Sequence, residues 1–342
     1  MRLPLPWLLA LTTAALALLL IGSLATGPMS LSLGESLRAL FAGQQSGIEA
    51  HKLLIVQEIR LPRTLLCIAV GAILGLCGAV MQGLFRNPLA DPGIIGVSGG
   101  AALGAALAIV LLAPLSQQWQ SLLGLGLLPL LAFLGGALTT TLVYLLGTRE
   151  GGTSVTVMLL AGVAITALSG AVIGLLTYLA DDQMLRNLSL WQMGSLAAGK
   201  PLDVALTLAT LAALLWLFMR DANPLNALLL GEGEALHLGV NVQALKRRLI
   251  LLTAAGVGVA VAVAGMIGFV GLVVPHLVRL LAGPNHVRLL PLSALLGAGL
   301  LLGADMLART LLAPAELPVG IITALMGAPF FIWLLVKSRR TL

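Results

Sequence analysis

A polar stretch inside the apolar chain, residues 220–248, has the composition of a docking surface. It carries charges of both signs, including Glu232 and Glu234, beside helix-stopping glycines and a short amphipathic pattern. Almost every segment around it is apolar enough to lie in lipid. A polar segment inside an apolar chain is typical of the place where a membrane protein meets a soluble partner. We therefore predict that residues 220–248 form a cytoplasmic segment that binds such a partner.

Three arginines on the opposite side of the predicted membrane could bind carboxylates. Arg60 and Arg63 are three residues apart, so they share one face at the start of a helix, and Arg309 ends a later apolar segment. Guanidinium groups form short, charge-assisted hydrogen bonds with carboxylates. Two alternatives stay open. Arg60 and Arg63 could reach lipid headgroups, and Arg309 could pair inside the bundle with Asp305, four residues earlier.

The sequence carries no pattern for nucleotide hydrolysis. A phosphate-binding loop needs Gly-x-x-x-x-Gly-Lys followed by Ser or Thr, whereas the one Gly-Lys pair, Gly199-Lys200, precedes Pro201. If the protein uses ATP, another chain hydrolyses it. The four histidines are scattered, which disfavours an intramembrane enzyme or a metal site. They are His51, His237, His276 and His286.

The elements that must position these residues are membrane helices. Of the 342 residues, 59% are hydrophobic and 9% are charged, a balance that a soluble core cannot bury. The apolar runs are continuous rather than alternating, which disfavours a β-barrel. The net charge of +6 agrees better with the excess of lysine and arginine in the cytoplasmic loops of proteins embedded in membrane lipid than with binding to nucleic acid. We therefore predict an all-α polytopic membrane protein.

At roughly 20 apolar residues per crossing, the sequence predicts ten transmembrane helices. The first is taken as a retained span, because its apolar run is longer than that of a signal peptide. The predicted ranges are 5–26, 63–83, 93–113, 122–147, 152–180, 201–219, 245–268, 269–283, 287–311 and 318–337. Lysine and arginine are concentrated on the N-terminal side, with 12 of the 19 there, so both termini are predicted to be cytoplasmic.

Several stretches of this sequence resemble one family of membrane proteins. The stretches are residues 58–63 with 78–82, 86–92 with 96–98, 232–239, 268–276, and 316–320 with 327–329. Together they are similar to the permease subunit of the bacterial ABC importers for iron–siderophore, heme and cobalamin (FecCD-type), most of all to heme permeases. The resemblance runs from about residue 50 to the end of the chain.

The resemblance implies the type II ABC importer permease fold in a single domain, residues 1–342, with residues 220–248 as its coupling segment. It implies a homodimer in the bacterial inner membrane, two cytoplasmic ATPase subunits that bind the ATP, and a periplasmic substrate-binding protein. The permease itself would hold no tightly bound cofactor and would not be an enzyme.

The resemblance also assigns roles to particular residues. Coupling to the ATPase would fall to Leu229, Leu230, Gly231, Glu232, Glu234, Leu236 and Gly239. Docking of the binding protein would fall to Arg60, Arg63 and Arg309. A cytoplasmic gate would include Thr153, Ser154 and Thr156, although these residues could instead provide a helix N-cap and packing.

Heme is the expected cargo, with a ferric siderophore or cobalamin as the alternative. An ion-coupled secondary transporter is a further alternative, and it would need unpaired carboxylates near the bilayer midplane. The clear candidate for such a carboxylate is Asp305, which has Arg309 one helical turn away. The sequence therefore favours an ATP-driven importer.

Overall fold

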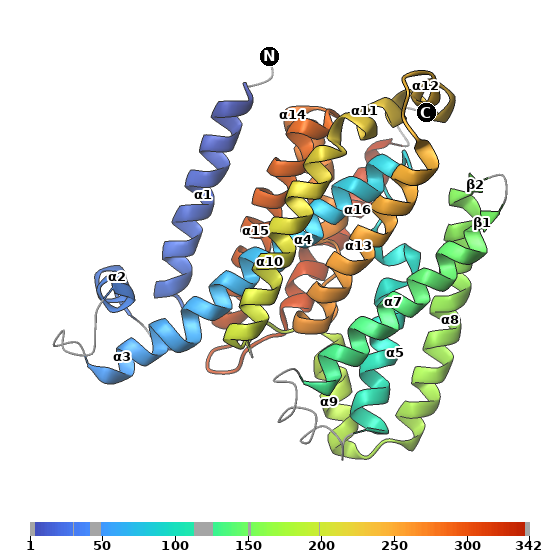
Figure 1. Cartoon of the computed structure of the whole chain (residues 1–342). Helices are drawn as coiled ribbons and strands as arrows, with labels where there is room; N and C mark the ends of the chain where they lie inside the picture. The colour runs from blue at the N-terminus through green and yellow to red at the C-terminus, as the bar shows by residue number, and fades with distance from the viewer. Residues whose placement is uncertain are drawn as a thin grey trace.

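A computed structural model describes residues 4–29, 31–41, 49–112, 126–149, 152–197 and 199–338. Within these ranges the chain is a bundle of long helices, joined by short helices and one two-stranded hairpin (Figure 1). The central α4 is surrounded by α10, α13, α14 and α15, with α1 on one side and the group α5, α7 and α8 on the other. The prediction of an all-helical fold is confirmed.

Ten apolar helices in the described part coincide with the ten predicted segments. They are α1 (Leu5–Ala25), α4 (Leu61–Leu84), α5 (Val97–Val110), α7 (Leu127–Gly147), α8 (Val155–Leu179), α10 (Pro201–Arg220), α13 (Val242–Ala264), α14 (Val270–Ala282), α15 (His286–Thr310) and α16 (Val319–Ser338). Seven are long and apolar enough to cross a membrane, whereas the apolar runs of α5, α14 and α16 are shorter. The chain is thus a multi-pass membrane protein, and the number of ten crossings stays a prediction.

The remaining elements are short and lie at the ends of the long helices. They are α2 (Leu33–Phe41), α3 (Ala50–Leu54), the π-helix η1 (Ile55–Arg60), the 3₁₀-helix η2 (Pro92–Ile95), the strands β1 (Thr148–Arg149) and β2 (Gly152–Thr153), α9 (Asp182–Gln192), α11 (Ala222–Leu230) and α12 (Glu232–His237). The third predicted segment begins four residues late, at Val97, because η2 and the left-handed Gly96 precede it.

The two ends of the bundle differ. The start of α1, the end of α16, α11 and α12 lie at one end, while α2, α3 and α9 lie at the other (Figure 1). The start of α1 and the end of α16 therefore share a side with the predicted coupling segment. At the opposite end Lys52 binds Glu35 at 2.8 Å. This hydrogen bond, together with those from Ser32, lowers the pKa of Glu35 to about 2. The carboxylate therefore stays charged far below neutral pH.

Glycines bring the backbones of neighbouring helices into direct contact. A Cβ on Gly75 of α4 would lie 2.4 Å from the carbonyl oxygen of Ser293, and one on Gly297 of α15 would lie 2.3 Å from that of Gly71. The α5–α7 pair is equally tight, since a Cβ on Gly104 would lie 2.0 Å from the Leu131 carbonyl oxygen. Lipid provides no hydrophobic drive for helix association, so such close van der Waals packing stabilises the bundle.

Two glycines of the same helix test the importance of this contact. We expect Gly297→Ala to lower stability by about 1–3 kcal/mol, because the added methyl group meets backbone atoms that cannot move aside. Gly303→Ala is the matched control, because nothing lies within 4 Å of its Cβ position and alanine favours the helix by about 1 kcal/mol. Thermal unfolding of the purified variants in detergent measures both. Equal melting temperatures would contradict the packing argument.

Candidate coupling segment and buried charge network

The middle of the coupling segment consists of two short helices that meet at a glycine. Gly231 separates α11 from α12 with φ 127 and ψ 158, and Gly239 follows α12 with φ 81. Residues with a Cβ strongly disfavour these conformations. The helix-stopping role predicted for the glycines therefore agrees with the structure.

The coupling segment exposes leucines at the end of the molecule. Leu225 and Leu228 of α11 and Ala235 of α12 are buried against the bundle. The opposite faces of the two helices are uncovered, and their exposed leucines are Leu229, Leu230, Leu236 and Leu238, at 39%, 68%, 59% and 64%. Exposed apolar side chains gathered on a short polar segment are typical of a protein-binding site.

The two predicted acidic contacts have different surroundings. Glu232 binds the Lys246 Nζ at 2.7 Å, and the buried Lys246 also donates to the Thr153 carbonyl oxygen at 3.1 Å. Glu234 is exposed and has no partner among the residues that the structure describes. Of the two carboxylates, Glu234 is thus free to meet another protein, while Glu232 fixes α12 to α13 and β2.

Side-chain contacts that the sequence did not reveal hold α11 in place. Arg248 of α13 binds the carboxylate of Asp221, with its Nε at 2.7 Å. Asn226 donates to the Asn285 Oδ1 at 3.0 Å and accepts a hydrogen bond from the backbone N–H of His286 at 2.8 Å. These bonds attach the coupling segment to the first turn of α15. A polar residue within a leucine-rich helix was the one available signal for Asn226.

The three predicted gate residues lie together at the start of α8, in different environments. Thr153 is buried in β2, and its backbone N–H donates to the Gln243 Oε1 at 3.0 Å. Ser154 caps α8 by accepting from the Val157 N–H, which agrees with the N-cap alternative. Thr156 is exposed on α8. The gate assignment itself stays a prediction.

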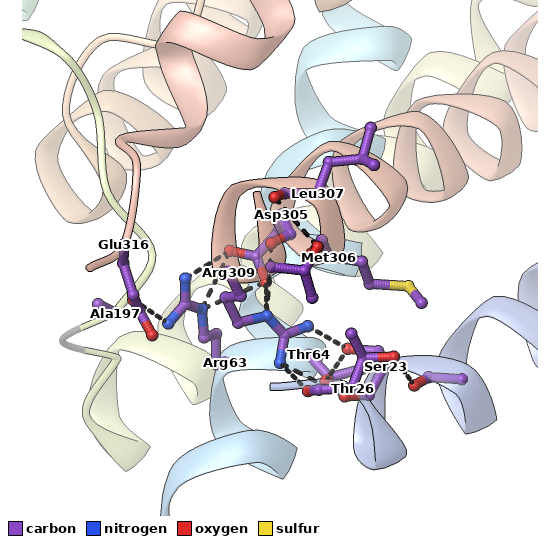
Figure 2. A network of polar contacts seen from close by, with 12 residues as sticks. Ser23, Thr26, Arg63, Thr64, Ala197, Asp305, Met306, Leu307, Arg309 and Glu316 are labelled. Atoms are coloured by element: carbon purple, nitrogen blue, oxygen red, sulfur yellow. Dashed lines mark hydrogen bonds and ion pairs between the residues drawn. The ribbon is translucent and has the colours of Figure 1, made fainter. Parts of the chain in front are cut away.

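A buried charge network lies at the other end of the bundle (Figure 2). Asp305 of α15 is completely buried and is shared by two guanidinium groups. Arg63 of α4 donates to it from Nε at 3.0 Å and from Nη2 at 2.8 Å, and Arg309 approaches it with Nε at 2.9 Å. The remaining donors are also occupied, since the Arg63 Nη1 binds Glu316 at 2.7 Å and the Arg309 Nη2 donates to the Ser23 Oγ at 2.7 Å.

Arg60 completes this end of the molecule by capping α1. It donates to the carbonyl oxygens of Leu24 and Ala25, both at 2.8 Å, and to that of Met29. The last carbonyl groups of a helix have no partner within the helix, so the guanidinium satisfies acceptors that lipid cannot. Arg60 is the last residue of the π-helix η1, an element that often appears at functional sites.

The structure therefore brings the three predicted docking arginines to one end but buries them. Arg60, Arg63 and Arg309 are 4%, 6% and 2% exposed. The alternative in which Arg309 pairs with Asp305 agrees with the structure. Each guanidinium group finds its partners within the chain. A docking role for these arginines stays a prediction.

This chain is similar to membrane transport proteins of one family. Residues 15–337 match the model of the FecCD transport family. The chain belongs to that family. It is 48% identical over 329 residues to the hemin transport system permease protein HmuU of Yersinia pestis, covering 95% of this chain and 93% of that protein. It is 42% identical over 338 residues to the vitamin B12 import system permease protein BtuC of Klebsiella pneumoniae, covering 97% and 94%.

A solved structure shares the fold of this FecCD chain. It is described as a metal-chelate type ABC transporter in an inward-facing conformation, with a TM-score of 0.83, 35% identity, and coverage of 97% of this chain and 99% of that one. These matches confirm the predicted family and the predicted ABC importer permease. The relatives are transport permeases, so the protein is not an enzyme.

The two carboxylates of the charge network provide a paired test. Asp305→Asn would leave the buried Arg309 without a carboxylate and Arg63 with Glu316 alone, so we expect a loss of about 3–5 kcal/mol. Glu316→Gln should cost no more than about 1 kcal/mol, because the Glu316 side chain is 34% exposed. Melting curves of the purified variants measure the difference, and equal losses would show that Asp305 is not the centre of the network.

Proposed function

We propose that this chain is the inner-membrane permease of an ATP-driven importer that takes heme, or a related iron chelate, from a periplasmic binding protein. The supporting observation is the identity to the hemin permease over nearly the full length of both proteins. Two copies of the chain form the pathway, both termini are cytoplasmic, and two separate ATPase subunits bind the ATP. The whole chain is one permease domain.

The coupling segment is the proposed contact with the ATPase. Its exposed leucines, among them Leu230 and Leu236, supply an apolar contact, and Glu234 supplies a free carboxylate for a basic residue of the ATPase. Glu232 has a different task in this proposal, because its pairing with Lys246 makes α12 move together with α13. Gly231 and Gly239 shape the backbone around α12.

The homodimer is proposed to form along α8. Gly170 and Gly174 of α8 are exposed, and nothing lies within 4 Å of a Cβ placed on either. Two glycines four residues apart let membrane helices approach closely. Thr156, the exposed member of the predicted gate, lies on the same helix. A second copy packed on α8 would place this hydroxyl group near the pathway between the subunits.

The coupling proposal predicts that Glu234→Lys combined with Leu236→Asp weakens ATPase binding at least about tenfold. The variant replaces a free acid and an exposed leucine of the contact surface without touching the Glu232–Lys246 pair. Asp182→Lys is the control, because it reverses an exposed carboxylate at the opposite end of the molecule. Copurification with the cognate ATPase measures the effect. Unchanged assembly of the double variant would argue against the coupling assignment.

Uptake by proteoliposomes tests the function as a whole. The vesicles contain this permease and its cognate ATPase, with ATP inside and binding protein preloaded with heme, a ferric siderophore or cobalamin outside. We expect ATP-dependent uptake of heme. Uptake of either other cargo would retain the importer and replace heme, a real alternative given the vitamin B12 permease among the relatives. Uptake driven by an ion gradient without ATP would overturn the proposal.

A further inference from the structure

The buried charge network has one more cation than it has carboxylates. In the described part of the chain it comprises three guanidinium groups and two acids. Arg63 and Arg309 face Asp305, and Arg63 also faces Glu316. Arg60 is hydrogen-bonded to backbone carbonyl groups and to no described carboxylate, so its charge is not balanced. The site is thus electropositive even when both acids are in place.

The two carboxylates differ in how easily each can move away from its guanidinium partners. Asp305 is fully buried between two guanidinium groups, so its removal would uncover both. Glu316 is 34% exposed and makes one ion pair, with the Arg63 Nη1. It lies on the connection between α15 and α16, where residues 311–316 are all exposed. Glu316 can therefore turn into water and open one donor of Arg63.

We propose that Glu316 holds the place of a carboxylate of the periplasmic partner. An acidic side chain of the docking protein displaces Glu316 and takes its position on the Arg63 Nη1. This inference rests on the proposed function, in which a binding protein docks at this end. It explains how a guanidinium that is 6% exposed can serve in docking, since it is covered by a side chain that can leave.

The exchange preserves the charge of the buried site. One carboxylate replaces another on Arg63, so the Nη1 donor keeps a charged acceptor while Asp305 stays in place. The displaced Glu316 regains its hydration in water. In the permease alone, the Arg63 Nη1 therefore keeps Glu316 as its partner. Docking is limited to partners that present an acid at the right place. Electrostatic matching of this kind contributes specificity as well as affinity.

The displaced segment continues directly into α16. Four residues after Glu316, the Gly320 N–H donates to the Met193 carbonyl oxygen at 3.1 Å, next to the end of α9. A Cβ on Gly320 would lie 2.2 Å from that oxygen, so the contact tolerates little movement. A shift of Glu316 on docking would therefore be passed to the start of α16 and the end of α9.

Affinity measurements on the full-length permease in nanodiscs test the exchange. Glu316→Gln should tighten binding of the cargo-loaded binding protein about fivefold, because the competing carboxylate is gone. Glu316→Ala should act in the same direction, and it covers the case in which glutamine still bonds to Arg63. Glu58→Gln is the control, since it removes an exposed carboxylate at the same end that has no ion pair within the described part of the chain. It should change the dissociation constant less than about twofold.

The outcomes separate the inference from the function beneath it. Tighter binding by both Glu316 variants, and not by Glu58→Gln, supports the exchange. If the Glu316 variants bind no tighter than Glu58→Gln, Glu316 is not a stand-in, while docking itself remains established by the wild-type affinity. No binding to the wild-type permease by any cargo-loaded binding protein would overturn both the docking and the exchange.

Discussion

The shared carboxylate of Asp305 is the interaction on which the rest of this structure depends. A buried ion in a membrane protein is costly unless it is paired and fully hydrogen-bonded. Asp305 meets this condition by accepting from Arg63 of α4 and Arg309 of α15 together. Arg309 then reaches the end of α1 through Ser23. One carboxylate thus fixes three helices whose apolar surfaces alone would not select a single arrangement in lipid.

The helix that carries Asp305 also connects the two polar ends of the molecule. α15 has 25 residues and is therefore about 38 Å long. Its first turn is bonded to Asn226 of the coupling segment, and its last turns carry Asp305 and Arg309. Between these ends it is locked against α4 by backbone contact at Gly75 and Gly297. The helix is therefore a continuous connection between the two polar ends.

The helix positions could be predicted from the sequence because lipid demands long apolar runs. The offset at the third segment has a local cause, since Pro92 opens a 3₁₀ turn before α5. The π-helix η1 has no comparable signal. Within the sites, the Arg309–Asp305 pair was readable because it spans four residues, whereas the Arg63–Asp305 pair spans 242. Contacts of that range depend on how the helices assemble, and this is why burial of the arginines was not foreseen.

The end of the bundle that carries the coupling segment has a shared polar group of its own. Lys246 joins the Glu232 carboxylate to the backbone carbonyl of Thr153, so α12, α13 and β2 are linked through one ammonium group. The residue after Thr153 caps α8. These bonds connect α12 to the first turn of α8, the helix proposed to line the dimer pathway. Under the proposed function, Glu232 acts by transmitting movement inward, while the partner protein binds the leucines and Glu234 beside it.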